Sequence, residues 1–516
     1  MVLTSSDPLE STSISSPELE SELSPFITAT YFFLCRSTGW KRLVGMLENS
    51  AVAYEVLGSD PGNREYSKTC PDAACGYIAF ITGANESKKF LFDTARNQGL
   101  NILVIDSNKS AGLTLARNGT VDHFIPLDLN TDPDIAARQC VSALRDTDLP
   151  ILGIVTFMEM AVLVTSKVAE LMNLPGHAPM SVEIARDKKL TRVITSKAGL
   201  PSMRHYTIKM ADDLLPAAEH VMFPAVLKPV IGADSLGVKR VNTFSELSQA
   251  FEEAKKVVQS VVISSGLLCM VDDTPATSSS VVPMEFLLEE YLDGDEVDID
   301  LLLYNGHCLY AAVSDNGETF EPFFTETYGV LPSRLSASVQ HGLEQLAIES
   351  VKAIGLNTGV FHVEAKQTTN RGPRLIEINA RLGGGPICEM HKRVYDVDLA
   401  AEQIRLACGW APSPRCRDRE STKKCFAYMT TNAISSGRVG RDLTFLDTYR
   451  SMPGVDLIKC RVVPGDVVVG PQDGQPSWLV EIWMSNNESA SPASIVDEIC
   501  DISDMIARDF QERYDI

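Results

Sequence analysis

The pattern of apolar and polar positions changes near Tyr77 and divides the chain into an N-terminal part and a longer, regularly patterned part. Residues 1–25 are rich in Ser, Pro and Glu and have few apolar side chains, so they cannot bury enough surface to offset the entropy cost of ordering. We expect a disordered tail over 1–25 and an N-terminal extension of unknown role over 26–76. From Tyr77 onward, apolar runs of strand length alternate with amphipathic runs of helix length, which predicts an α/β protein.

The region 77–185 predicts a Rossmann-like lobe. Its apolar runs YIAFITG and NILVIDSN predict strands on either side of a helix over 89–98, and GIVTF repeats the strand pattern before a helix over 158–172. The turn after the first strand, GANES, lacks the three glycines at GxGxxG spacing that bring a backbone close to a dinucleotide pyrophosphate. We therefore interpret this lobe as a scaffold rather than a dinucleotide site.

Two further regions follow. Residues 186–410 mix short strands with helices and hold nearly all of the polar motifs, with a smaller lobe over about 207–289 as a candidate lid. The composition of 272–280 predicts a surface loop within that lobe. After Trp410, a stretch rich in Pro and charge predicts a linker. Residues 420–516 then predict a small C-terminal α+β domain, with strands at 425–431, 457–463 and 478–484 and a helix at 492–510.

Charge and composition narrow the classes of function. The chain has 46 Lys and Arg against 68 Asp and Glu, a formal net charge of −22, which disfavours binding to nucleic acids and to anionic membranes. The early apolar run from Ile27 to Cys35 is too short for a membrane span of roughly 20 residues. Twelve cysteines are scattered without CxxC or zinc-type spacing, as is typical of a reduced compartment. We expect a cytoplasmic enzyme acting on small molecules.

A hairpin between Val360 and Gly385 carries a candidate metal site. Two strand patterns flank a turn near Asn370, and an antiparallel register then places Glu364 opposite Glu377, where like charges destabilise the pairing. Asn379 projects from the same face as Glu377 because side chains alternate along a strand. Mg²⁺ or Mn²⁺ prefers such oxygen ligands. From spacing alone, two solvent-exposed glutamates on a hairpin are an equal alternative.

Two glycine-rich stretches are candidate anion sites. Arg381 offers a planar donor fork for carboxylate or phosphate, and the following triple glycine allows backbone amides to approach an anion. Lys228 precedes the loop from Gly232 to Gly237, whose amides can turn onto phosphate oxygens although no Walker motif is present. Taken singly, a flexible turn beside a surface arginine and a plain hairpin turn explain these stretches equally well or better.

The acidic segment from Phe286 to Leu303 is a third candidate. Its carboxylates at Glu289, Glu290 and Glu296 can accept hydrogen bonds from an adenine amino group or from ribose hydroxyls. The same pattern also predicts a half-exposed strand, a turn at 293–294 and a second strand.

The order of these motifs along the chain resembles the ATP-grasp superfamily of carboxylate-amine ligases. The resemblance covers roughly 77–410 and joins Asp187-Lys188, FPAVLKP, the glycine loop, EEYLDGDE, Glu364 and EINARLGGG. It implies an ATP-grasp fold with a Rossmann-like N-terminal lobe, a small α+β lid lobe and a larger α+β catalytic lobe. It also implies that lysines and the glycine loop bind the ATP phosphates, a hinge binds adenine and an acid binds ribose. The residues so implied are Lys188, Lys228, Gly232, Ser235, Gly237, Glu289, Tyr291, Leu292 and Glu296, with Lys189 replacing Lys188 if the register differs by one.

The resemblance also implies the metal and substrate residues. Glu364, Glu377 and Asn379 match the Mg²⁺ ligands, and Arg381 matches the arginine that steadies an acyl phosphate, which makes Arg381 and Lys228 the expected catalytic residues. Gly384 is expected beside the substrate.

Within the superfamily, SDNGETFEPFFTETYGVLPSRL and EINARLGGG resemble the carnosine synthase group of amino-acid ligases. We expect Glu326, on a loop in this stretch, to hold the ammonium of an amino-acid substrate by charge-assisted hydrogen bonds, and a solvated loop acid is the alternative. Ala380 stands where relatives usually have Pro, and Gly329 stands where bacterial dipeptide ligases often have His, so the substrates stay open.

The implied reaction joins a carboxylic acid, expected to be an amino acid, to an amino acid through an acyl phosphate, with ADP and phosphate as products. ATP and Mg²⁺ or Mn²⁺ are the implied cofactors. The alternatives are ligation of the acid to coenzyme A and a catalytically silent ATP-binding module. A homodimer is one alternative for the oligomeric state.

Overall fold

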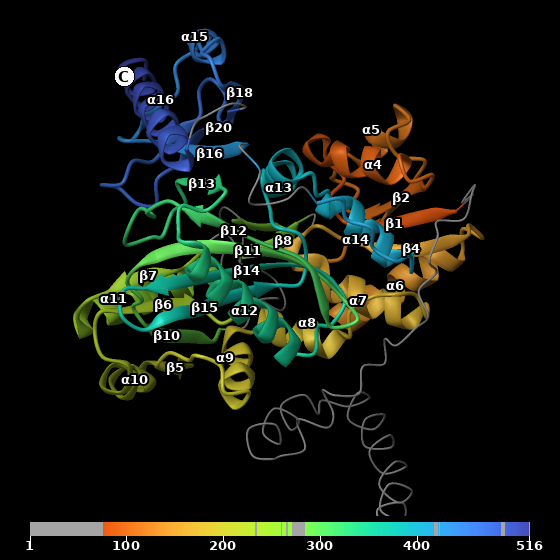
Figure 1. Cartoon of the computed structure of the whole chain (residues 1–516), viewed down its shortest axis with the longest axis horizontal. Helices are drawn as coiled ribbons and strands as arrows, with labels where there is room; N and C mark the ends of the chain where they lie inside the picture. The colour runs from red at the N-terminus through yellow and green to blue at the C-terminus, as the bar shows by residue number, and fades with distance from the viewer. Residues whose placement is uncertain are drawn as a thin grey trace, which may run out of the picture. The chain divides into compact units, whose positions relative to one another are not determined.

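The computed structural model describes residues 76–232, 235–259, 284–416, 422, 424–486 and 491–514, and the backbone alone of 261–264 and 267–270 (Figure 1). The tail and extension expected over 1–75 and the loop expected over 272–280 lie outside these residues.

The N-terminal lobe is a parallel sheet in the order β3-β2-β1-β4. Alternate residues of its strands enter two cores: Phe80 and Val104 lie in one, and Ile81 and Leu103 lie in the other. Both faces are therefore buried, which is why the strands are continuous apolar runs. The predicted Rossmann-like arrangement is confirmed. Its elements are β1 (Tyr77–Ile81), η1 (Glu86–Lys88), α4 (Lys89–Arg96), β2 (Asn101–Asp106), α5 (Gly112–Arg117), β3 (His123–Pro126), α6 (Pro133–Arg145), β4 (Ile151–Val155), η2 (Glu159–Ala161), α7 (Val162–Leu171) and α8 (Pro179–Arg186).

The smaller lobe has an antiparallel sheet in the order β5-β10-β6-β7. Leu227 and Leu288 enter a core with residues of α10 and α11, and Phe251 of α11 meets Phe286 edge to face at 5.4 Å. Because side chains alternate, Lys228 and Glu289 lie on the opposite face of the sheet. Its elements are β5 (His205–Ile208), η3 (Ala211–Asp213), α10 (Leu214–Val221), β6 (Ala225–Pro229), β7 (Lys239–Val241), α11 (Phe244–Gln259), β8 (Val261–Ser264), β9 (Leu267–Met270) and β10 (Phe286–Glu290).

The larger lobe is built on an eight-stranded sheet in the order β15-β14-β11-β12-β13-β16-β20-β18, and every neighbouring pair is antiparallel. Its strands are β11 (Asp295–Tyr304), β12 (His307–Asn316), β13 (Tyr328–Leu331), β14 (Gly359–Thr368), β15 (Gly372–Asn379), β16 (Cys425–Asn432), β18 (Val455–Cys460) and β20 (Trp478–Asn486). The helices are α9 (Lys188–Lys197), α12 (Ala337–Ala353), α13 (Ile387–Tyr395), α14 (Leu399–Ala407), α15 (Leu446–Arg450) and α16 (Pro492–Glu512).

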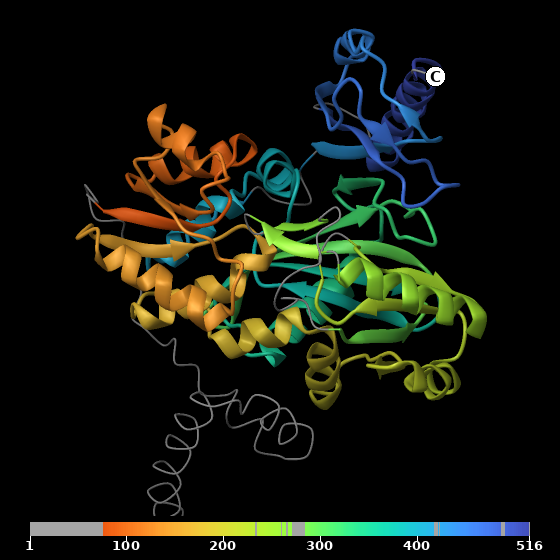
Figure 2. The same ribbon diagram turned by 180° about the vertical axis from the view of Figure 1, so that it is seen from behind.

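The C-terminal strands and helix form where the sequence predicts them, but the strands do not make a sheet of their own. β16 pairs with β13, so β16, β20 and β18 continue the sheet of the larger lobe (Figure 2). A hydrophobic cluster that includes Val480, Ile499 and Phe510 packs α16 onto these strands. A short pair, β17 (Gly437–Arg438) and β19 (Val467–Val468), completes this part.

Within the described ranges, no helix combines the length and the apolar character needed to cross a membrane.

Candidate active site

Helix α9 presents one cation toward β15 of the larger lobe and another toward β10 of the smaller lobe. Asp187 caps its N-terminus by accepting a hydrogen bond from the Leu190 amide at 2.9 Å. Lys188, its first residue, lies 2.9 Å from Glu377 Oε1 on β15. Arg192 follows four residues later and shares the same helix face. Lys188 of the predicted motif therefore contacts the oxygen cluster, and its phosphate-binding role stays a prediction.

A buried ion cluster lies between α9 and the sheet of the smaller lobe, here called the lid sheet (β5-β10-β6-β7). Its members are Arg192, Lys228 and Glu289. Arg192 Nε lies 2.7 Å from Glu289 Oε1, the Lys228 ammonium contacts Glu289 Oε2, and the three side chains are 3%, 7% and 4% exposed. Burial would raise the pKa of Glu289, but the two cations lower it to about 2. Burial lowers the pKa of Lys228, and the nearby Arg192 and Lys188 charges lower it further. The single carboxylate of Glu289 thus pairs with two cations, Arg192 and Lys228. A phosphate bound here would supply the negative charge that the cluster lacks.

Arg192 was not predicted to be part of the site. Its Nη2 atom also donates to the Ile376 carbonyl at 2.6 Å, so it ties α9 to both β10 and β15. The signal available in the sequence was its spacing of four residues from Lys188.

The paired acids Glu289 and Glu290 point to opposite faces of β10. Glu290 accepts from Arg204 Nε at 3.0 Å and from Arg371 Nη1 at 2.9 Å. Both carboxylates are therefore engaged by arginine or lysine. For either carboxylate to accept a hydrogen bond from an adenine amino group or a ribose hydroxyl, as the sequence suggested, an existing ion pair would have to be displaced.

The passage from β10 to β11 brings Tyr291, Leu292 and Glu296 together. Lys366 donates to the Leu292 carbonyl at 3.3 Å, and its ammonium lies 3.5 Å from Glu296 Oε2. The Tyr291 hydroxyl donates to Glu321 at 2.7 Å, and the Arg240 guanidinium lies 4.1 Å from the ring centroid. Burial and the Glu321 hydrogen bond raise the pKa of Tyr291 to about 12. These three residues of the predicted nucleotide hinge lie at the junction of the lid and larger sheets.

The loop from Gly232 to Gly237, predicted to bind phosphate, is described only in part, because residues 233 and 234 lie outside the described ranges. Ser235 and Gly237 have φ of +54° and +75°, so the chain turns through the left-handed region there. A Cβ at Gly237 would lie 3.3 Å from Pro229 Cγ, which shows that this turn lies close to the end of β6.

The oxygen cluster forms on β14 and β15. The register pairs Glu364 with Glu377, which confirms the predicted pairing, and Asn379 Nδ2 donates to Glu364 Oε1 at 3.3 Å. Burial, followed by the charge of Glu377, raises the pKa of Glu364 to about 7. A cation between the two carboxylates would remove this repulsion.

The donor set fits a hard cation that takes further ligands from its substrate. No group of three or more His, Cys, Asp or Glu side chains suited to a metal occurs in the part of the chain that the structure describes. Mg²⁺ would therefore need the Asn379 amide oxygen, water and nucleotide phosphates beside the two glutamates, as is usual for this ion.

A glutamate of the N-terminal lobe, Glu159, orients the Arg381 side chain. Its Nε donates to Glu159 Oε2 on η2 at 2.8 Å, and its Nη1 donates to the Leu382 carbonyl at 2.9 Å. Its Nη2 lies 3.4 Å from Asn379 Oδ1, beside the oxygen cluster. Arg381 thus joins the edge of the Rossmann-like lobe to the predicted metal ligands.

The triple glycine has one crowded and two open positions. A Cβ at Gly383 would lie 2.7 Å from His362 Nδ1 and 2.9 Å from Ile387 Cγ2, so only glycine fits there. Gly384 and Gly385 have open space around them, and Gly385 has a φ of +53°. The backbone therefore packs closely against His362 and Ile387 at Gly383, and it is accessible at Gly384.

A buried polar network below this loop was not predicted. Asp300 accepts from His362 at 3.0 Å and pairs with His391 Nε2 at 2.8 Å, and the Tyr310 hydroxyl meets His391 Nδ1 at 2.6 Å. Burial would lower the pKa of His362, but the charges of Asp298 and Asp300 raise it to about 10. The available signal was a pair of aspartates inside an otherwise apolar strand.

Glu326 lies between β12 and β13 and is exposed. Its backbone carbonyl accepts from Asn432 at 3.2 Å. Its charge is close enough to Glu364 to help raise the pKa of that group. The amine-binding role of Glu326 stays a prediction.

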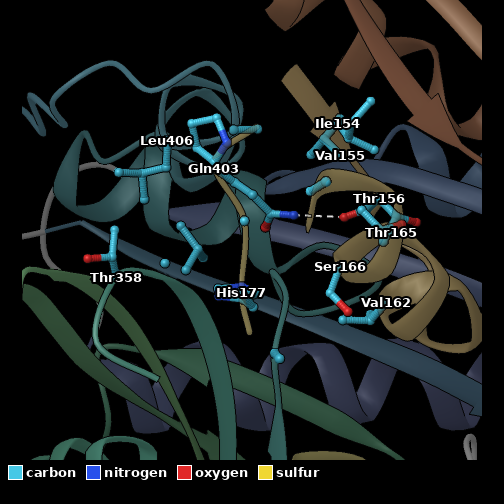
Figure 3. A pocket seen from close by; sticks show the side chains of 17 residues that line it. Ile154, Val155, Thr156, Val162, Thr165, Ser166, His177, Thr358, Gln403 and Leu406 are labelled. Carbon is cyan, nitrogen blue, oxygen red and sulfur yellow. Dashed lines mark hydrogen bonds between the residues drawn. The ribbon is translucent and has the colours of Figure 1, made fainter. Parts of the chain in front are cut away.

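A cavity of about 70 Å³ lies behind the site, among residues of β4, α7, α14 and the start of β14 (Figure 3). Gln403 donates to the Thr156 carbonyl at 2.7 Å across it and accepts from the Leu382 amide at 3.0 Å. Ala380, which follows the last residue of β15, lines the cavity, but Glu364, Glu377 and Asn379 are not among its lining residues. The cavity is therefore separate from the oxygen cluster.

Comparison with known protein families identifies the family to which this chain belongs. The ATP-grasp N-terminal domain family matches residues 92–176, and the ATP-grasp domain family matches residues 221–389. The chain is an ATP-grasp domain protein. Lys228 and Glu289 of the ion cluster and the three residues of the oxygen cluster lie inside the second match, whereas Arg192 precedes it.

This ATP-grasp protein is a distant homologue of carnosine synthase. It is 28% identical to carnosine synthase 1 of Homo sapiens over 404 residues, which are 76% of this chain and 47% of that protein. It is 31% identical to the Gallus gallus protein over 373 residues, 70% of this chain and 38% of that protein. Alanine–anticapsin ligase of Bacillus subtilis strain 168 is 26% identical over 263 residues, 50% of this chain and 54% of that enzyme. The chain thus spans less than half the length of these carnosine synthases.

Solved structures confirm the predicted ATP-grasp fold. The L-amino acid ligase of Bacillus licheniformis superposes with a TM-score of 0.69 at 22% identity, over 83% of this chain and 97% of that one. A biotin carboxylase domain from Hydrogenobacter thermophilus, solved with MgADP, superposes with a TM-score of 0.57 at 15% identity, over 85% and 90% of the two chains.

Proposed function

We propose that this ATP-grasp protein is an ADP-forming ligase that joins a carboxylic acid to the amine of an amino acid through an acyl phosphate. The observation that supports this most directly is the contact between Lys188 and Glu377, since it links a candidate phosphate-binding lysine to a candidate metal ligand at 2.9 Å. Distant homology to carnosine synthase and to alanine–anticapsin ligase adds support for amino-acid substrates.

The proposed reaction has two displacements. An oxygen of the acid attacks the γ-phosphorus of ATP, the bond to the bridging oxygen breaks, and ADP leaves. The amine nitrogen then attacks the acyl carbon, the bond to the phosphate oxygen breaks, and orthophosphate and the amine proton are released. When bound by Glu364, Glu377 and Asn379, Mg²⁺ would neutralise phosphate charge.

The side chains have distinct proposed tasks in these steps. Lys188 and Lys228 bind the phosphates, and Arg192 and Glu289 keep the Lys228 ammonium in place. Arg381, oriented by Glu159, supplies a donor fork to the reacting carboxylate and then to the acyl phosphate. The accessible amides near Gly384 add donors beside it. Closing the lid excludes water, which would otherwise hydrolyse the acyl phosphate.

We expect ADP and orthophosphate, and no AMP or pyrophosphate, when the purified protein is incubated with ATP, Mg²⁺ and pooled amino and carboxylic acids. The reason is that the lysines and the oxygen cluster serve transfer of the terminal phosphoryl group to a carboxylate. Mass spectrometry of the same mixture identifies the condensation product. Release of pyrophosphate would contradict an acyl-phosphate intermediate. Turnover that depends on coenzyme A would show that a thiol, not an amine, is the nucleophile. An absence of ADP would indicate a catalytically silent ATP-binding module.

Glu326→Gln is expected to raise the KM of one amino-acid substrate about tenfold or more while leaving ATP affinity unchanged. An ionised carboxylate on this loop holds an ammonium by charge-assisted hydrogen bonds that a neutral amide cannot replace. Steady-state kinetics with each substrate varied in turn measures the effect. Glu318→Gln, an exposed acid on the same loop, is the matched control. Equal KM values in parent and Glu326→Gln protein would contradict the assignment.

A further inference from the structure

Positive side chains that the proposed reaction does not use gather around Arg381. Lys88 ends η1, which follows β1, and Glu159 begins η2, which follows β4. β1 and β4 are parallel neighbours, so both turns lie at the carboxyl edge of the sheet. Glu159 holds Arg381 at this edge, and Lys88 interacts electrostatically with the Arg381 charge.

Two more cations, from the C-terminal strands, interact electrostatically with Lys88. Lys459 on β18 lies opposite Glu481 on β20 in the strand register, and Arg461, two residues further on, forms an ion pair with Glu481. Trp483 lies on the same face of β20 as Glu481 and packs against the core that contains Phe80 and Leu382. This face of the C-terminal strands is therefore turned toward the N-terminal lobe and the glycine loop.

The cluster has more positive than negative charge. Glu159 is shared by Arg381 and Arg186, and Glu481 is taken by Arg461. Among the residues that the structure describes, the ammonium groups of Lys88 and Lys459 have no ion-pair or hydrogen-bond partner. Burial, and then the charges of Arg381, Lys459 and Arg461, lower the pKa of Lys88, and the charge of Glu481 offsets only part of this effect. An anionic ligand would relieve this repulsion, which is unexpected in a chain of net charge −22.

We propose that Lys88 and Lys459 bind a second anionic group on the acid substrate, which is then a dicarboxylate or a carboxylate that carries a phosphate. Arg381 holds the carboxylate that reacts, and this part rests on the proposed function. The nucleotide is a weaker candidate for the ligand. Every predicted ATP-binding residue lies between Lys188 and Glu296, whereas the two lysines come from the N-terminal lobe and the C-terminal strands.

The test compares the binding of acids that differ only in their second anionic group. Isothermal titration calorimetry of the full chain uses glutarate, valerate with the same five carbons, and 3-phosphonopropionate. We expect glutarate to bind at least about tenfold more tightly than valerate. Lys88→Gln combined with Lys459→Gln should remove that difference without changing ATP affinity. Lys88→Arg should retain it, and Lys352→Gln, an exposed lysine on α12, is the matched control.

The outcomes separate this inference from the proposed function. Tighter binding of 3-phosphonopropionate than of glutarate would identify a phosphate-bearing acid, and the reverse a dicarboxylate. Equal or undetectable binding of glutarate and valerate, or unchanged glutarate binding in the double variant, would overturn the second anion site. Lysine-dependent glutarate binding without any amide product would support the anion site and contradict the ligase. Amide formation from monocarboxylic acids that the double variant leaves unchanged would support the ligase and contradict the anion site.

Discussion

Glu377→Gln is expected to lower turnover by a factor of about 10² or more while leaving the fold intact. The substitution keeps the shape of the side chain but removes the charge that faces Glu364 across the ladder and Lys188 at 2.9 Å. A site that loses this charge binds Mg²⁺ more weakly and leaves the Lys188 ammonium without its carboxylate. The rate of ADP release at saturating ATP measures the loss, and circular dichroism checks the fold.

Two comparisons make the Glu377 result specific. Glu349→Gln changes an exposed acid on α12 and should retain parental activity. Raising the Mg²⁺ concentration should recover part of the lost rate, because weaker binding is offset by mass action. Activity of Glu377→Gln within a factor of three of the parent would exclude Glu377 as a metal ligand.

Glu289→Gln is expected to lower the free energy of unfolding by about 3–5 kcal/mol, because it leaves buried cations uncompensated. Arg192 and Lys228 both face this carboxylate, and all three side chains are less than 8% exposed. Urea unfolding without nucleotide, followed by tryptophan fluorescence, measures the change.

Glu290→Gln provides the matched control on the neighbouring residue. The carboxylate of Glu290 pairs with Arg204 and Arg371, which are both 42% exposed, so water can solvate them after the substitution. We expect a loss of about 1 kcal/mol or less. If Glu289 served adenine instead of the buried cations, Glu289→Gln would weaken ATP binding and leave the unfolding free energy without nucleotide unchanged.

Local patterns were sufficient to predict the parts of the site that one hairpin contains. The strands that become β14 and β15 are joined by a short turn, so the turn fixes the register and with it the pairing of Glu364 and Glu377. The apolar runs of the N-terminal lobe predicted its parallel sheet for a similar reason, since strands buried on both faces have few polar positions.

The rest of the site depends on contacts between distant segments. Arg192 acquires its role only when α9 packs beside β10, and no spacing in the sequence relates it to Glu289. Asp300, His391 and Tyr310 come from β11, α13 and β12 and meet only in the folded chain. Alternation placed Glu289 and Glu290 on opposite faces, but it could not tell which face would be turned toward α9.

The continuous sheet from β15 to β18 determines where the protein can be shortened. A chain cut before Cys425 would keep the residues that match the ATP-grasp domain family but would remove β16, the hydrogen-bonded partner of β13. The freed edge of β13 would then be open to strands of other molecules, and such edges promote aggregation. The smallest well-behaved fragment with an intact active site is therefore set by strand pairing, and it extends through α16 rather than ending with the last motif.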